Sequence, residues 1–194
     1  MNLPRTNRIY RYPADEYATS EEFCGVFTED AAGLYLLSFL LTANHERAEQ
    51  CFVAGLEDCV KHNAVFKEWA RSWARRTIVR NAIHIVAPHP DRAPGTFAGI
   101  HPEADRKRQQ PQDQPAAIAS ILVLGDFDRF VFVMFVLERY TEKECSVLLD
   151  CSQQDVREAR MRAPQQIAEY TKDNAAGQGD AIPSSVRSPE LQVH

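Results

Sequence analysis

The stretch Thr141-Glu-Lys-Glu-Cys-Ser-Val-Leu-Leu-Asp-Cys-Ser-Gln-Gln-Asp-Val-Arg-Glu-Ala-Arg-Met-Arg-Ala163 contains two helix starts in quick succession. Thr141 and Glu144 have the spacing of a capping box, in which the hydroxyl and the carboxylate each accept from a backbone N–H of the first turn. Ser152 and Asp155 repeat this spacing with a shorter acid. Apolar residues follow each start at helical spacing. The stretch therefore predicts two consecutive helices.

The turn between these helices is expected at residues 150–152, with Asp150 at the position where glycine is common. Aspartate tolerates left-handed backbone geometry better than most residues do. The pattern is that of a helix-turn-helix, although an ordinary surface helical hairpin has the same spacing. The second helix carries Arg157, Arg160 and Arg162, a residue type that contacts phosphates and guanine edges in DNA.

Composition restricts the class of protein. The chain has 194 residues, 44% of them hydrophobic, and a net charge of −5. No apolar run reaches the roughly 18 residues of a membrane span, and the N-terminus lacks the pattern of a secretory signal. We therefore expect a cytoplasmic protein without membrane association, built of one domain or two small ones. The net charge argues against general coating of nucleic acid, so any contact would be confined to local basic patches.

The five cysteines are odd in number and contain no C-x-x-C pair. This favours reduced, mostly buried thiols over a disulfide framework or a zinc site. A metal site is the alternative where His45 precedes Cys51 and His62 follows Cys59. We expect no metal, no cofactor and no enzymatic activity, because no Gly-rich phosphate loop, carboxylate pair with a base or nucleophile motif is present.

Proline and glycine divide the chain. Residues 87–116 hold a cluster of both and read as a flexible linker, while the small, polar residues 171–194 are expected to be an unfolded tail. Residues 1–28 form an unassigned N-terminal arm. The two remaining segments, 29–86 and 117–170, are each predicted to be a small helical domain. Each has roughly 55 residues and is marginal for independent folding, so the halves could need each other or a partner.

The first helical segment contains three helical patterns. Residues 31–41 are almost wholly apolar, and Asn44 can cap a second, amphipathic helix in which Gly55 permits close approach of a neighbour. A third helix is expected from about Asn63 to Val86. The cations along it, which could contact DNA or form a solvated row, are Lys67, Arg71, Arg75, Arg76 and Arg80.

Residues 129–137 are aromatic and β-branched, a composition that by propensity alone favours a strand. No partner strand lies near them in the sequence, and they directly precede the helix-turn-helix. We therefore predict a buried helix. With this element the whole chain is expected to be all-α.

The order of these segments resembles the bacterial RNA polymerase sigma factors of the small, two-domain extracytoplasmic-function type, in the sigma-70 family. Asp128-Arg-Phe-Val-Phe and Glu138-Arg-Tyr-Thr-Glu-Lys-Glu-Cys resemble the family's "R-x-V-F … E … S/T-x-x-E-I-A". Leu148-Leu-Asp-Cys-Ser152 resembles "I-L-G-I-S". In the first half, residues 34–42 resemble "L-Y-R-L-A-x-x-L-T", and Phe66-Lys-Glu-Trp69 with Arg75-Arg-Thr-Ile-Val-Arg-Asn81 resembles "F-R-A-W-L … I-A-R-N".

The resemblance implies a region 2-like three-helix bundle and a region 4-like helix-turn-helix domain, joined by the Pro-rich linker. It also implies transcription initiation, with RNA polymerase core and promoter DNA as partners and an anti-sigma factor as a further possible one. The second domain would read the minus-thirty-five element through residues 153–162, which adds Gln153 and Gln154 to the three arginines. In the first domain, Trp69 and Trp73 could stack on unpaired bases, although their shared face favours a place in the core.

The chain departs from the family in three places. Ala159 stands where an arginine is common, and Pro164 should kink or end a helix that the family continues. The stretch Gln50-Cys-Phe-Val-Ala-Gly-Leu56 is apolar where the family's core-binding helix is polar and acidic. The alternative function is therefore a sigma-like interaction or regulatory protein that no longer binds the polymerase core, and a DNA-binding regulator without polymerase contact is a third. The residues that would dock a protein partner are Cys51, Phe52, Val53 and Leu56.

Overall fold

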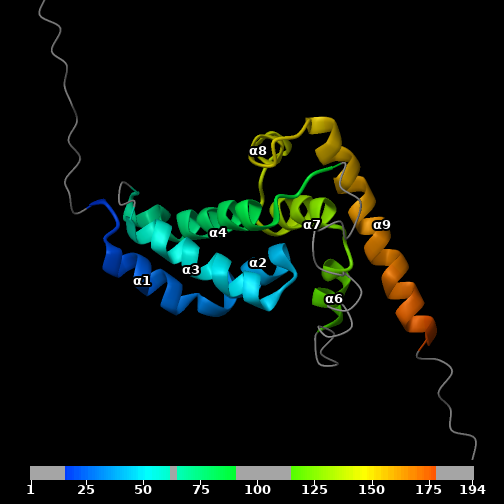
Figure 1. Cartoon of the computed structure of the whole chain (residues 1–194), viewed down its shortest axis with the longest axis horizontal. Coiled ribbons are helices and arrows are strands. Elements are labelled where there is room, and N and C mark those ends of the chain that lie inside the picture. The colour runs from blue at the N-terminus through cyan, green and yellow to red at the C-terminus, as the bar shows by residue number, and fades with distance from the viewer. Residues whose placement is uncertain (1–15, 62–64, 91–114, 178–194) are drawn as a thin grey trace, which may run out of the picture.

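The computed structural model describes residues 16–61, 65–90 and 115–177 (Figure 1). Within these ranges every regular element is a helix, and the only extended pairing is an isolated bridge between Tyr17 and Phe66. The predicted all-α fold is confirmed. No single helix of the described ranges is long and apolar enough to cross a membrane; the bent pair of the first two helices passes that test only when both are taken together.

The first half contains four helices rather than the predicted three. They are α1 (Ser20–Glu29), α2 (Ala31–Thr42), α3 (His45–Lys61) and α4 (Ala70–Val86), with a 3-10 turn η2 (Lys67–Trp69) before the last. Helix α1 lies in the segment that the sequence left unassigned, and a capping box of Thr19 with Glu22 sets its start. It packs on α3 and α4 with Phe23 and Phe27 buried. The third predicted helix begins later than expected, since α4 starts at Ala70. Residues 62–64, at its predicted start, lie outside the described residues.

Two local predictions for α3 are confirmed. The Asn44 side chain accepts from the Arg47 backbone N–H at 3.0 Å and so caps the helix. Gly55 allows α3 to approach α4, since a Cβ built on it would lie 2.6 Å from Cδ1 of Ile78. A side chain at Gly55 would therefore force the Ile78 side chain to move from its packed position.

The second half consists of α6 (Ala116–Leu122), α7 (Asp126–Phe132), the π-helix η3 (Val133–Leu137), α8 (Glu142–Leu148) and α9 (Gln153–Gly177). The apolar run is helical, as predicted, and Phe130, Val131 and Met134 are fully buried. The widened turn closes with a bond from the Glu138 N–H to the Val133 carbonyl at 3.0 Å. It ends the buried helix and directs the chain toward α8.

Helix α9 is longer than the sequence predicted. It continues through Pro164 and reaches Gly177, so the helix does not end at the proline, and the expected unfolded chain from Thr171 is wrong over residues 171–177. Pro164 lies on the exposed side, where water can bind the carbonyl that loses its donor. On the opposite side Ala163 is fully buried, and α9 packs on α7 and α6. This packing holds the helix together across the proline.

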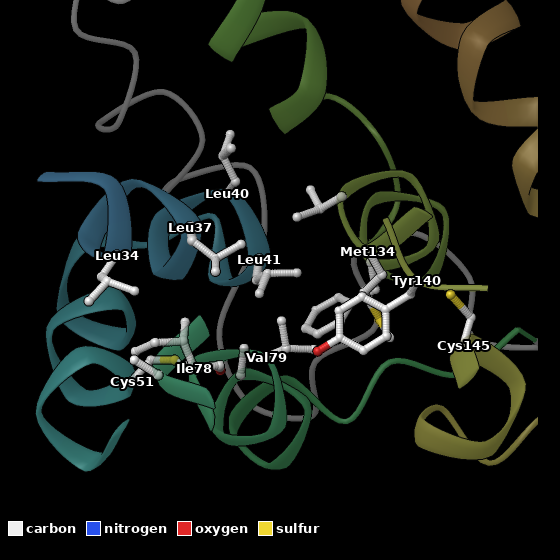
Figure 2. Close-up of a cluster of buried hydrophobic side chains, with 14 of the residues drawn as sticks. Leu34, Leu37, Leu40, Leu41, Cys51, Ile78, Val79, Met134, Tyr140 and Cys145 are labelled. Carbon is white, nitrogen blue, oxygen red and sulfur yellow. Dashed lines mark hydrogen bonds between the residues drawn. The ribbon is translucent and has the colours of Figure 1, made fainter. Parts of the chain in front are cut away.

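The two halves share one hydrophobic core, so the prediction of two separate lobes is not confirmed; residues 91–114 of the predicted linker lie outside the description. Figure 2 shows Leu41 and Val79 of the first half in one cluster with Met134 and Tyr140 of the second. Helix α7 lies against α2.

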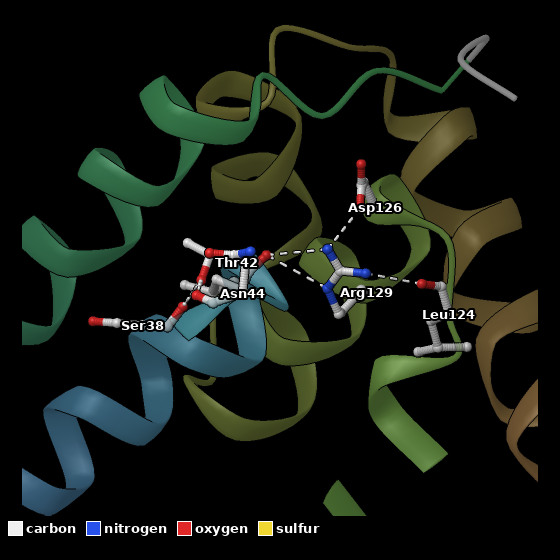
Figure 3. A network of polar contacts seen from close by, with 7 residues as sticks. Ser38, Thr42, Asn44, Leu124, Asp126 and Arg129 are labelled. Carbon is white, nitrogen blue, oxygen red and sulfur yellow. Dashed lines mark hydrogen bonds and ion pairs between the residues drawn. The ribbon is translucent and has the colours of Figure 1, made fainter. Parts of the chain in front are cut away.

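A buried arginine of α7 joins the halves. Arg129, only 3% exposed, donates to the carbonyl of Leu41 at the C-terminal end of α2, with Nε at 3.4 Å and Nη2 at 3.3 Å. The same guanidinium bonds the Leu124 carbonyl at 2.9 Å and pairs with Asp126 at 2.6 Å, as Figure 3 shows. It satisfies a carbonyl that the end of α2 leaves without a helical donor.

Candidate nucleic-acid interface

The two consecutive helices and the turn that the sequence predicted are formed by α8 and α9. Thr141 Oγ1 accepts from the Glu144 N–H at 3.2 Å, and the Thr141 N–H donates to the Glu144 carboxylate at 2.9 Å. At the start of α9 the Asp155 N–H donates to Ser152 Oγ at 3.1 Å, and the Ser152 N–H donates to Asp155 at 2.9 Å. Asp150 takes the left-handed turn conformation, with φ of 50°. Both capping boxes and the turn residue are confirmed.

These capping bonds affect the two carboxyl groups directly. The pKa of Glu144 is lowered, first because its carboxylate accepts from the backbone N–H of Thr141. The pKa of Asp155 is also lowered, first by the Ser152 hydroxyl. Both carboxylates are therefore more acidic than ordinary ones, and both helix starts hold a negative charge where the helix dipole favours it.

Helix α9 has a buried side and a basic, exposed side. Val156, Ala159 and Ala163 face the core and are fully buried, so alanine fits where the sigma pattern usually has an arginine. Arg157 and Arg160 lie on the other side, with side chains 54% and 49% exposed. Gln153 and Gln154 are exposed at the start of the helix, and Gln154 bonds Glu158 at 3.0 Å. Of the predicted DNA-reading residues, Gln153, Gln154, Arg157 and Arg160 are thus exposed to solvent on α9.

Arg162 has a different environment from the other two arginines. Its Nε and Nη2 form a two-point contact with the Asp128 carboxylate of α7 at 2.9 and 2.6 Å, and Gln166 adds a third bond to that carboxylate at 3.2 Å. The Asp128 side chain is only 9% exposed. This hydrogen bonding raises the pKa of Arg162. Its geometry fastens α9 to α7, and a role in DNA reading stays a prediction.

The acid that holds Arg157 and Arg160 belongs to α8. Glu142 accepts from Arg157 Nε at 3.1 Å and from Arg160 Nη1 at 3.0 Å, one carboxylate oxygen for each. The Arg160 guanidinium also lies 4.2 Å from the ring centroid of Phe135 in η3, a cation–π distance. The sequence analysis did not single out Glu142, Phe135 or Asp128.

Most cations of the basic row predicted along the third helix form ion pairs with acids. Lys67 pairs with Glu22 at 2.9 Å, and Arg71 pairs with Glu29. Arg80 is exposed and has no ion-pair partner among the residues that the structure describes. Both pairs have exposed partners on α1, so these cations remain open to solvent.

Arg75 and Arg76 of this row contact the second half. Arg75 makes a two-point contact with Glu138 at 2.9 and 2.6 Å, and a longer one with Asp30 at 3.4 Å. The Glu138 side chain is only 5% exposed, and the hydrogen bonds that Arg75 donates to this carboxylate raise the pKa of Arg75. Arg76 pairs with Glu144 at 3.3 Å and lies 5.5 Å from the Tyr140 ring centroid. The two arginines thus join the halves, and their predicted DNA contact is untested.

The two tryptophans separate in the structure. Trp69 precedes α4 and is 56% exposed, with Phe66 against it edge-on at 5.3 Å. Trp73 is partly buried against the core. The interpretation that both belong to the core is therefore wrong for Trp69, which is more than half exposed to solvent.

The predicted partner-binding stripe faces inward for the most part. Cys51 is fully buried and donates from Sγ to the Ile78 carbonyl at 3.3 Å, and burial raises the pKa of its thiol to about 11. Phe52 packs edge-on against Phe27 at 5.3 Å, and Leu56 lies partly buried on the core. Only Val53, 53% exposed, remains open to a partner, so the prediction is wrong for Cys51.

No metal centre is built by the described part of the chain, where no three His, Cys, Asp or Glu side chains come together. His45 stacks on Phe39 at 4.4 Å and shares a hydrogen bond with Tyr35 at 2.9 Å, and Cys59 is buried as a free thiol.

No protein-family model matches this chain, and no curated protein matches it either.

Proposed function

We propose that this chain is a sigma-factor-like DNA-binding protein that directs RNA polymerase to promoters. The observation that carries the proposal is the position of Arg157 and Arg160. They lie on the exposed side of α9, in the first turns of this second helix of the capped helical pair. In this motif the N-terminal residues of the second helix contact base edges in the major groove.

The surface of α3 supports contact with a second protein. Because Cys51, Phe52 and Leu56 turn toward the bundle, the exposed face of α3 is formed by other residues. This face consists of Glu46, Glu49, Gln50, Val53 and Glu57. The matching helix of the sigma factors that the chain resembles is polar and acidic as well. The apolar residues of this helix thus pack in the core, and its exposed residues support polymerase binding.

The charge of the chain makes a second binding partner useful. With a net charge of −5 the protein repels DNA overall, and only local cations attract phosphate. Anchoring to polymerase would raise the effective concentration of α9 at the promoter without any new DNA contact. This division of labour fits a protein whose basic surface is as small as that of α9.

The experiment is a selection of bound duplexes from fragmented genomic DNA, followed by run-off transcription from the selected fragments with purified core polymerase. The test variant is the double change Arg157→Ala and Arg160→Ala, and the matched control is Lys172→Ala, an exposed cation of α9 far from the turn. A base-reading arginine contributes about 1–3 kcal/mol, so the double variant should lose at least tenfold in affinity for the selected site.

Three outcomes separate the candidate functions. Transcripts that depend on the selected sequence and on the two arginines support the proposal. A footprint without transcription, and without recovery of polymerase subunits in a pull-down, would indicate a DNA-binding regulator instead. If no duplex is selected and no transcript appears, DNA binding is overturned. Only the role of a sigma-like interaction protein then remains.

A further inference from the structure

One carboxylate holds both of the exposed arginines of the candidate interface. Glu142 is the first residue of α8, and the capping box of Thr141 fixes the backbone at that point. Its two oxygens bond Arg157 and Arg160 at 3.1 and 3.0 Å, and the two arginines are three residues apart on α9. The Glu142 side chain is 27% exposed, so it lies at the edge of the surface rather than inside the protein.

Arg160 is held from a second direction. Its guanidinium lies over the Phe135 ring at 4.2 Å, and Phe135 belongs to the π-helix rather than to α8 or α9. A planar cation with an aromatic ring on its face and a carboxylate at its edge has few orientations left. Among the residues that the structure describes, Arg157 is restrained by Glu142 alone. The pair is thus oriented before any ligand binds.

The other acids near α9 bind other groups. Asp155 caps the helix through Ser152, Glu158 bonds Gln154, and Asp128 holds Arg162. Among the described residues Glu142 is the one acid that contacts Arg157 and Arg160. Its loss would therefore release both side chains at once, while the helix that carries them keeps its own caps and its buried face.

We infer that Glu142 is a positioning residue that sets the sequence selectivity of this protein at the expense of its total affinity for DNA. The inference rests on the proposed function. Arginines oriented as a pair meet base edges in one register, whereas released arginines can turn to any phosphate. The carboxylate itself repels the phosphate backbone. Both effects of Glu142 favour selected sites over arbitrary duplexes.

The test compares Glu142→Gln with Glu169→Gln, which removes the same charge from an exposed acid of α9 outside residues 153–162. Dissociation constants are measured for the selected duplex and for a scrambled duplex of equal length and composition. Glu142→Gln should bind the scrambled duplex several times more tightly and lose about tenfold in the ratio of the two constants. Glu169→Gln should strengthen both equally and leave the ratio unchanged.

Two further variants separate orientation from charge. Glu142→Asp keeps the charge but shortens the reach, so selectivity should fall without a gain in binding to the scrambled duplex. Phe135→Leu keeps an apolar side chain at that position and removes the ring from Arg160, with the same expected result. Thermal unfolding of each variant confirms that it is folded before binding is measured.

The outcomes that contradict the inference differ from those that contradict the proposed function. A wild-type protein that binds no duplex selectively overturns the proposed function, and the inference falls with it. A selective wild-type protein with a ratio within twofold of that of Glu142→Gln overturns the inference alone. The same holds if Glu169→Gln lowers selectivity as much as Glu142→Gln does, since bulk charge would then explain the effect.

Discussion

Helices α4 and α9 both carry arginines in rows, yet the structure uses them differently. Arg75 and Arg76 of α4 bind Glu138 and Glu144, which lie 63 and 68 residues further along the chain. Arg157 of α9 binds Glu142, only 15 residues away. The Glu138 side chain is 5% exposed and that of Glu142 is 27% exposed. The burial of the acid therefore distinguishes Arg75, which joins the two halves, from Arg157, which remains available to a ligand; Glu144, the partner of Arg76, is 40% exposed.

The strongest contrast is with the fully buried Arg129, and its removal should have the largest effect on stability. Arg129→Ala leaves the carbonyls of Leu41 and Leu124 without this donor and Asp126 without its cation. Each buried carbonyl left unsatisfied costs about 1–3 kcal/mol, while the Asp126 carboxylate, 32% exposed, can be hydrated. We expect that loss in the free energy of unfolding, measured by denaturant titration. The matched control, Arg80→Ala, should change it by less than about 0.5 kcal/mol.

The prediction for Arg129 depends on the halves folding together. If Arg129→Ala destabilises the chain no more than Arg80→Ala does, the contact between α7 and α2 is not maintained in solution. In that case the two lobes that the sequence predicts would describe the protein better than the shared core does.

A smaller effect is expected for the contact between α4 and the second half. Arg75→Ala leaves the nearly buried Glu138 carboxylate without its two-point partner, and hydrogen bonds to charged groups contribute about 1.5–3 kcal/mol. We expect a loss of about 2 kcal/mol in the free energy of unfolding. A double-mutant cycle with Glu138→Gln should show coupling between the two positions. Additive losses would mean that the pair does not join the halves.

What the sequence could predict follows from the range of the interactions. The capping boxes at Thr141 and Ser152 act over three residues, so their spacing alone gave the helix starts. The turn at Asp150 was equally local. The helix over 129–137 needed one tertiary argument, namely that no partner strand was near. All of these predictions are confirmed.

What the sequence could not predict depends on packing between distant segments. Pro164 lowers the helical propensity of α9, but the buried Ala163 beside it shows that contacts with α7 and α6 outweigh this penalty. The partners of Arg75 and Arg76 follow from the docking of the halves, which no spacing reveals. Glu142 was visible as an acid at a helix start, yet only the crossing of α8 and α9 places it between two arginines.

The dependence of stability on pH tests the capping boxes. The pKa of Glu144 lies below its ordinary value of 4.5, so the unfolded chain takes up the proton more readily than the folded one. Stability should therefore fall as the pH drops below about 4.5 and through the folded pKa. In Glu144→Gln, measured by denaturant titration at a series of pH values, this fall should be shallower. Glu169→Gln, an exposed acid of α9 with no ion pair among the described residues, should follow the wild type.

The smallest effect on stability is expected where the effect on ligand binding is largest. Arg157 and Arg160 are about half exposed and pair with Glu142 at the surface, where such ion pairs contribute about 0–1 kcal/mol. Each single change to alanine should alter the free energy of unfolding by less than about 0.5 kcal/mol, against about 2 kcal/mol for Arg75→Ala. A loss as large as that of Arg75→Ala would show that the α9 pair, like the α4 row, holds the fold together, and the difference between the two helices would disappear.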